Sequence, residues 1–134
     1  MTIKSKILIV EDDQPIRELY QLKLELAGYR VMVAENGKIG LAMAERFMPD
    51  LILLDLRMPV MTGDEMLRQL REKEWGKDML IIILTNISKS EAPMVLRLLN
   101  VDQYIIKVHH TPQQLLDIID NTLKRHNKDW LFSV

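Results

Sequence analysis

The chain has 134 residues, enough for one domain with a sizeable hydrophobic core. Its net charge of -1 argues against nucleic acid or an anionic membrane as the main partner, and the absence of cysteine excludes disulfides and thiolate metal sites. No apolar run approaches the roughly 20 residues of a membrane span, and the N-terminal apolar stretch is too short for a signal peptide, so we expect a cytoplasmic protein.

Short apolar runs alternate with amphipathic segments along the whole chain. The runs predict strands at residues 7–10, 29–34, 51–54, 79–84 and 104–106. The amphipathic segments and their capping residues predict helices that begin near Gln14, Asn36, Gly63, Ser90 and Thr111. Five alternations of strand and helix indicate a parallel sheet with helices on both faces.

The start of the predicted fourth helix depends on Pro93. Residues 88–91 have the pattern of a capping box, which would begin the helix early. Pro93 would then lie beyond the first turn, where proline deletes a hydrogen bond. With Ser90 as the N-cap, Pro93 falls inside the first turn, so we expect a late helix start after a loop of residues 86–89.

Polar side chains follow four of the five predicted strands. Glu11 and Asp12 follow the first strand, Asp55 the third, Thr85 the fourth and Lys107 the fifth. An isolated acid in such a place more often only caps or solvates a loop. However, the carboxyl ends of parallel strands lie together at one edge of the sheet, where open α/β folds bind ligands. We therefore expect these side chains to converge on one small site.

Three neighbouring carboxylates repel one another unless a cation neutralises them. A site of oxygen ligands without cysteine or histidine suits a hard cation, and Mg²⁺ fits best. The surplus acid can then act as a nucleophile and take a phosphoryl group as an acyl phosphate. Mg²⁺ and Lys107 would offset the charge of the transferring group, and the hydroxyl of Thr85 would donate a hydrogen bond to it.

Four motifs stand in a fixed order along the chain: ILIVEDDQPIRE, LILLDLRMPVMTG, IIILTN and YIIK. Through them and their separations the chain resembles the receiver domain of bacterial two-component response regulators, over roughly Lys4 to His126. The resemblance implies a flavodoxin-like (βα)5 doubly wound sheet with strand order 2-1-3-4-5. It also implies a phosphorylation switch that promotes its own phosphorylation and hydrolysis and is not a turnover enzyme on a metabolite.

The resemblance implies a metal site built around the phosphoacceptor. Asp55 would accept the phosphoryl group and also bind Mg²⁺. Asp12, the backbone carbonyl of Arg57 and, through a water, Glu11 would be the other protein ligands of the metal. Asp13 matches no ligand, and we expect it to support the start of the first helix, where negative charge is favoured.

Three further residues would form the switch. Thr85 would bond the phosphoryl group and move toward it, and Lys107 would pair with Asp55 or with the phosphoryl group. Tyr104 would change rotamer as Thr85 moves. The implied phosphodonor is a sensor histidine kinase or a phosphotransfer protein.

We expect a receiver domain at residues 1–126 and a C-terminal tail at residues 127–134, without direct binding of nucleic acid or membrane. A downstream protein or a second copy of the chain would bind the face formed by the fourth helix, the fifth strand and the fifth helix. The apolar excess of residues 94–99 supports this face. The domain either stands alone or belongs to a longer chain, and the sequence does not decide between the two.

The chain departs from the family near the expected site. The family usually has proline after a cis peptide where this chain has Val108, and a cis bond without proline costs about 2.5–4 kcal/mol, so we expect a trans bond and a shifted loop. Asn86 stands where the family usually has a small residue. We hypothesise that Arg57 and Asn86 tune the lifetime of the phosphorylated state.

Three other functions compete with the phosphorylation switch. A phosphohydrolase of the haloacid dehalogenase type needs a second acid two residues after the nucleophile, where this chain has Arg57. A flavodoxin-like binding module needs a loop that cradles phosphate after the first strand, but this loop is acidic and repels phosphate. A receiver-like domain that acts by protein binding without phosphorylation remains the alternative, because the proline is missing.

Overall fold

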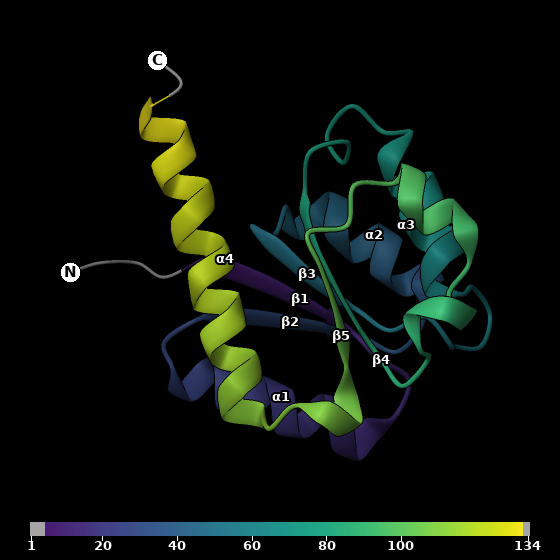
Figure 1. Cartoon of the computed structure of the whole chain (residues 1–134), viewed down its shortest axis with the longest axis horizontal. Coiled ribbons are helices and arrows are strands. Elements are labelled where there is room, and N and C mark those ends of the chain that lie inside the picture. The colour runs from purple at the N-terminus through teal and green to yellow at the C-terminus, as the bar shows by residue number, and fades with distance from the viewer. Residues whose placement is uncertain (1–4, 133–134) are drawn as a thin grey trace.

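A computed structural model of the chain describes the backbone of residues 5–132 and the side chains of residues 5–126. Five strands form one parallel sheet in the order β2-β1-β3-β4-β5 (Figure 1). The strands are β1 (Lys6–Val10), β2 (Arg30–Ala34), β3 (Leu51–Leu54), β4 (Leu80–Thr85) and β5 (Gln103–Ile106). The predicted fold class and strand order are confirmed.

Helices cover both faces of the sheet (Figure 1). One face carries α1 (Gln14–Leu26) and α4 (Pro112–Phe132), and the other carries α2 (Gly37–Phe47) and α3 (Gly63–Arg71). Side chains alternate along each strand, so Ile7 and Ile9 belong to the core under α1 and α4. Leu8 and Val10 belong to the core on the opposite face. The central strands are apolar throughout because both of their faces are buried.

The predicted α-helix beginning at Ser90 is wrong. Two short 3₁₀ helices, η1 (Lys89–Glu91) and η2 (Met94–Leu98), connect β4 to β5 instead. Ala92 lies between them in an extended conformation, with ψ of 146°. The residue before a proline is disfavoured in the α region, so Pro93 separates two turns and does not begin one helix. The predicted contact face therefore has η1 and η2 in place of its helix.

The final helix begins at the predicted signal. The hydroxyl of Thr111 accepts a hydrogen bond from the backbone N–H of Gln114 at 3.1 Å, and Pro112 occupies the first helical position. The helix buries Leu115, Leu116, Ile119, Thr122 and Leu123 against the sheet. It runs to Phe132, so residues 127–132 continue α4, and the predicted boundary at residue 126 remains a prediction. In the part of the chain that the structure describes, no helix combines the length and apolar character that spanning a membrane needs.

Candidate functional site

The polar residues that follow the strands meet at the carboxyl edge of the sheet, as predicted. Because β1 pairs with β3 in parallel register, Glu11 and Asp55 leave the sheet side by side. The backbone N–H of Asp55 donates to the carbonyl of Val10 at 3.1 Å, which fixes this arrangement. β4 pairs with β5 as far as Thr85, and the pairing brings Lys107 to the same edge.

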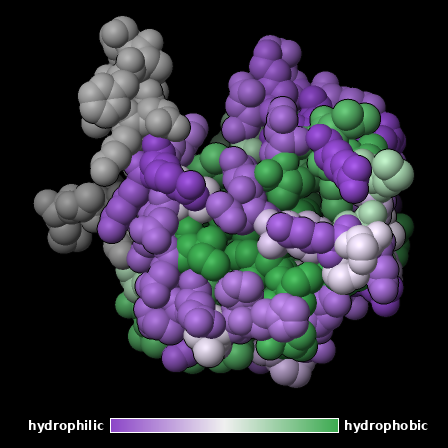
Figure 2. All heavy atoms as spheres, viewed as in Figure 1, coloured by the Kyte–Doolittle hydropathy of each residue, from purple (hydrophilic) through white to green (hydrophobic). Residues whose placement is uncertain are grey.

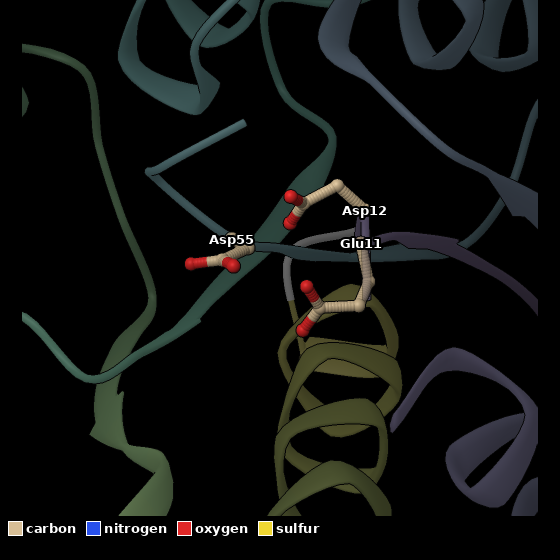
Figure 3. Close-up of side chains that lie close together, drawn as sticks. All are labelled: Glu11, Asp12 and Asp55. Atoms are coloured by element: carbon tan, nitrogen blue, oxygen red, sulfur yellow. The ribbon is translucent and has the colours of Figure 1, made fainter. Parts of the chain in front are cut away.

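Three carboxylates face one another at this edge (Figure 3). One oxygen of each of Glu11, Asp12 and Asp55 lies within 4.8 Å of the others. Glu11 and Asp55 are buried, with only 3% and 7% of their surface exposed, whereas Asp12 is exposed. Asp13 belongs to the helix instead: its carboxylate accepts the N–H of Ile16 at 3.0 Å and caps α1, which confirms its expected role.

The ammonium group of Lys107 lies between the two buried carboxylates. Its Nζ donates to Oδ2 of Asp55 at 3.1 Å and to Oε1 of Glu11. No peptide bond among the described residues is cis, so the bond to Val108 is trans as predicted. A short 3₁₀ turn, η3 (Lys107–His109), begins at the lysine. Lys107 thus reaches the acids without the proline that usually follows it in the family.

The electrostatics of the site show a shortage of positive charge. Burial raises the pKa of Glu11 to about 7; the hydrogen bond from Lys107 opposes this rise, and the charge of Asp55 adds to it. Burial also lowers the pKa of Lys107, but the hydrogen bond to Glu11 and the charge of Asp55 outweigh burial, so this pKa is raised. A single ammonium does not balance three carboxylates, and a divalent cation would complete the balance.

The donor set fits Mg²⁺. This ion binds hard oxygen ligands, keeps several waters and is usually held by one or two carboxylates. The buried Glu11 and Asp55 give fixed donors, and the exposed Asp12 leaves the site open to a hydrated ion. The expected contribution from the carbonyl of Arg57 remains a prediction.

Asp55, Thr85 and Lys107 line one surface pocket of about 260 Å³. Thr85 is buried, and its hydroxyl accepts the backbone N–H of Ile87 at 3.4 Å. The structure therefore brings together the three residues that the sequence suggested for phosphoryl chemistry. A hydroxyl can donate its own proton while it accepts this bond, so Thr85 remains able to bond a ligand oxygen.

The rim of this pocket carries Arg57, Asn86 and Glu91. Oδ1 of Asn86 accepts the backbone N–H of Val108 at 3.2 Å, so this side chain links the loops after β4 and β5. Arg57 is exposed, which leaves its guanidinium free to approach the pocket. The hypothesis that Arg57 and Asn86 tune the phosphorylated state stays a prediction.

Tyr104 connects β5 to the loop after Thr85. Its hydroxyl donates to the backbone carbonyl of Ile87 at 2.7 Å, and its ring packs against the core under α2 and α3. The N–H of Ile87 faces Thr85, so one residue of the loop contacts both side chains. This geometry couples Tyr104 to Thr85, although the predicted rotamer change itself remains a prediction.

A tight turn holds Asp55 in place. Gly63, the first residue of α3, lies so close that a Cβ there would be 2.0 Å from the carbonyl oxygen of Asp55. Its N–H donates to the carbonyl of Leu56 at 3.0 Å. The hydroxyl of Thr62 caps α3 by accepting the N–H of Glu65 at 3.4 Å. A glycine is needed here for close approach of the backbones.

Two residues of α1 belong to the site and were missed in the sequence. The guanidinium of Arg17 donates to the carbonyls of Glu11 at 2.8 Å and Asp12 at 3.4 Å, so it supports the turn that carries both acids. Tyr20 lies beside Glu11 and Asp55, with which it lines a narrow crevice. Arg17 lies within the motif ILIVEDDQPIRE, which was the available signal, but the spacing alone does not show which carbonyls it binds.

Known proteins similar to this chain share one kind of domain. A family model described as "Response regulator receiver domain" matches residues 7–120. The chain is 40% identical over 121 residues to the phosphate regulon transcriptional regulatory protein PhoB of Pseudomonas aeruginosa, a match that covers 89% of this chain and 52% of PhoB. It is 39% identical over 106 residues to the alkaline phosphatase synthesis transcriptional regulatory protein PhoP of Bacillus subtilis, covering 78% and 43%. The chain spans about half the length of the curated relatives it matches.

Solved structures agree with the sequence matches. A CheY-like receiver domain protein from Methanospirillum hungatei superposes with a TM-score of 0.83 at 32% identity, covering 93% of this chain and 98% of that one. The chemotaxis protein CheY4 of Vibrio cholerae superposes with a TM-score of 0.80 at 31% identity, covering 87% and 97%. Fold and sequence therefore indicate the same family.

Proposed function

The chain belongs to the response regulator receiver domain family, and on this premise we propose that Asp55 is the residue that takes up the phosphoryl group. The observation that carries the proposal is the convergence of Asp55, Thr85 and Lys107 on one pocket. The acids Glu11 and Asp12 stand beside it. A signalling switch of this kind changes a partner-binding surface when a charge is added at one residue.

We propose that the phosphodonor is a phosphohistidine of a kinase or phosphotransfer protein. A carboxylate oxygen of Asp55 attacks the phosphorus atom, the new O–P bond forms, and the P–N bond breaks as the imidazole leaves. Lys107, which pairs with Asp55 in the free chain, remains close enough to offset charge on the phosphoryl oxygens. Thr85 donates its hydroxyl proton to one of these oxygens.

We propose Glu11, Asp12, Asp55 and the carbonyl of Arg57 as the protein ligands of Mg²⁺. The ion supplies positive charge at the transferring group when it is bound. Burial raises the pKa of Glu11 to about 7, so this carboxyl group is partly protonated near neutral pH, and a bound cation would displace that proton by favouring the carboxylate. The site is thus set up to bind the cation with release of protons near neutral pH.

The direct test of the function is phosphorylation in vitro. Wild-type protein is incubated with acetyl phosphate and Mg²⁺, and its mass is followed; we expect a gain of one phosphoryl group that needs the cation. Asp55→Asn should abolish the gain, and Asp117→Asn, which changes an exposed acid on α4, should not. A wild-type chain that stays unmodified with Mg²⁺ would contradict the proposal and favour the receiver-like alternative that acts by binding alone.

We propose that the output surface lies over η2 and β5. A groove of about 400 Å³ runs between them, lined by Pro93, Leu96, Val101 and Tyr104 among others. Met94 and Leu98 beside it expose 73% and 82% of their surface, and Figure 2 shows apolar side chains among polar ones on this side of the molecule. Tyr104 joins the groove to the phosphoryl pocket through Ile87.

A charge placed on this surface tests its role. Leu96 is buried, so a charge there would disturb folding, and Leu98→Glu is the better change. We expect wild-type protein to associate with a second copy or a partner when Mg²⁺ and beryllofluoride are added, and Leu98→Glu to lose this association in light scattering. Leu26→Glu, at an exposed position at the end of α1, is the matched control. Equal behaviour of the two variants would contradict the assignment.

A further inference from the structure

Glu91 lies at the phosphoryl pocket, in the segment that follows β4. It is the last residue of η1, and it lines the same pocket as Asp55, Thr85 and Lys107. Its side chain is exposed, and among the described residues it forms no side-chain hydrogen bond or ion pair. A free carboxylate therefore lies at the entrance of a pocket that has to admit an anionic phosphoryl group.

The charged groups around the pocket differ in whether they are paired. Lys107 is occupied by Glu11 and Asp55, whereas Arg57 on the opposite loop is exposed and forms no ion pair among the described residues. Burial raises the pKa of Tyr104, and the charges of Asp55 and Glu91 add to this rise, which agrees with Glu91 lying near Tyr104. The rim therefore carries one unpaired anion and one unpaired cation.

We propose that Glu91 is a specificity-determining residue of the phosphorylation reaction: its carboxylate repels anionic phosphodonors that enter the pocket from solution. This inference rests on the proposed phosphorylation of Asp55. Small dianionic donors meet the repulsion of Glu91 as they enter, and Arg57 on the same rim offsets part of it. A donor protein that docks on the domain overcomes the same repulsion with contacts made elsewhere, so the rim charge favours phosphorylation by a docked partner.

The repulsion has a second consequence, because η1 leads directly into η2. Glu91 is separated from η2 only by Ala92 and Pro93. A phosphoryl group on Asp55 pushes against a carboxylate in the segment that carries the proposed output surface. The charge at the pocket thus acts on η2, which carries Met94 and Leu98, through the two connecting residues as well as through Tyr104.

The rate of phosphorylation by small donors of different charge tests the inference. We expect Glu91→Gln to raise the rate constant with acetyl phosphate and Mg²⁺ about two- to tenfold at low ionic strength, the range for one exposed charge near a dianion. Glu91→Lys should raise it further, and Glu91→Asp should restore the wild-type rate. The gain should shrink in high salt and be smaller with phosphoramidate, which carries less negative charge. A merely structural role of Glu91 predicts neither dependence.

Glu45→Gln is the matched control, because it removes the same charge from an exposed position near the end of α2, at the opposite end of the sheet. Equal rates for Glu91→Gln and wild type at low salt would overturn the inference, and so would an equal gain in Glu45→Gln or a gain that high salt does not reduce. These outcomes differ from failure of the proposed function, in which the wild-type chain itself takes up no phosphoryl group from either donor.

Discussion

Glu11 and Lys107 are far apart in the sequence and form a buried pair beside Asp55. The charged form of Glu11 is destabilised in this pair, because burial penalises a buried charge and Asp55 repels it. Lys107 is held by both acids and keeps its proton. At the scale of single residues, the site is therefore an anionic pocket with its one internal cation already engaged.

This pair makes folding stability depend on pH near neutrality. The pKa of Glu11 is about 7 in the folded chain and 4.5 in its ordinary state. Between these values the folded chain binds more protons than the unfolded chain, so its stability is greatest below the lower value and falls as the pH rises through the higher one. We expect the free energy of unfolding in urea with EDTA to fall between about pH 5 and about pH 8.

Glu11→Gln supplies the comparison for the pH dependence. The variant lacks the titrating carboxyl group but keeps the histidines. Any contribution of the histidines to the pH dependence of stability is therefore the same in both proteins. We expect a smaller fall in the variant than in the wild type. Parallel curves for the two proteins would show that Glu11 does not titrate in this range.

Among the structural elements, the turn between β3 and α3 fixes the position of the Asp55 backbone. Val60 in this turn has a φ of 68°, a left-handed conformation that is unusual for a β-branched residue. Gly63 then brings the first turn of α3 against the backbone of Asp55. The motif LILLDLRMPVMTG thus encodes a strand, a strained turn and a helix start as one unit.

Gly63→Ala should disturb this unit. The added Cβ would overlap the carbonyl oxygen of Asp55, so we expect the free energy of unfolding to fall by about 1–3 kcal/mol and Asp55 to be phosphorylated more slowly. Gly40→Ala on α2 is the control, because its Cβ would meet side-chain atoms of Met66 and Val10 and not backbone. Urea unfolding and the acetyl phosphate assay measure the two effects. Unchanged phosphorylation in a folded Gly63→Ala variant would contradict the proposed role of the turn.

In the molecule as a whole, Arg71 links the end of α3 to two loops by hydrogen bonds. Its guanidinium donates to five backbone carbonyls, those of Gly76, Lys77, Met79, Leu99 and Asn100, at 2.8–3.2 Å. The end of α3, the loop before β4 and the turn before β5 are thereby joined at the edge of the sheet opposite the acids. Burial lowers the pKa of Arg71, with opposing contributions from Asp102 and Asp78.

Arg71→Lys should destabilise the domain without changing its site. One ammonium cannot satisfy five carbonyls, so we expect the free energy of unfolding to fall by about 2–4 kcal/mol. Arg68→Lys is the control, because Arg68 forms exposed pairs with Glu65 and Glu72 that contribute about 0–1 kcal/mol. Urea unfolding measures both variants. Similar losses in the two would mean that the five hydrogen bonds add little to stability.

The amino-acid pattern was enough to predict the alternation of strands and helices along the chain, the edge at which the strands end and the residues at that edge. Apolar runs of strand length mark strands buried on both faces, and parallel connections bring their carboxyl ends together. For this reason Glu11, Asp12, Asp55, Thr85 and Lys107 could be assigned to one site before their positions were known.

The conformation between β4 and β5 and the pairing of charges in the site could not be predicted and depend on the folded chain. Local capping patterns favoured a helix there, but Pro93 forces Ala92 into an extended conformation, and packing of Leu96 into the core favours two short turns. Glu91, which lines the pocket, belongs to the first of these turns. Burial raises the pKa of Glu11, and the groups that modify this rise, Lys107 and Asp55, come from segments distant in sequence, so no local pattern contains the shift. The bond from Arg71 to the carbonyl of Leu99 likewise joins distant segments. The bonds from Arg17 are short-range, but they depend on the turn that the backbone takes after β1.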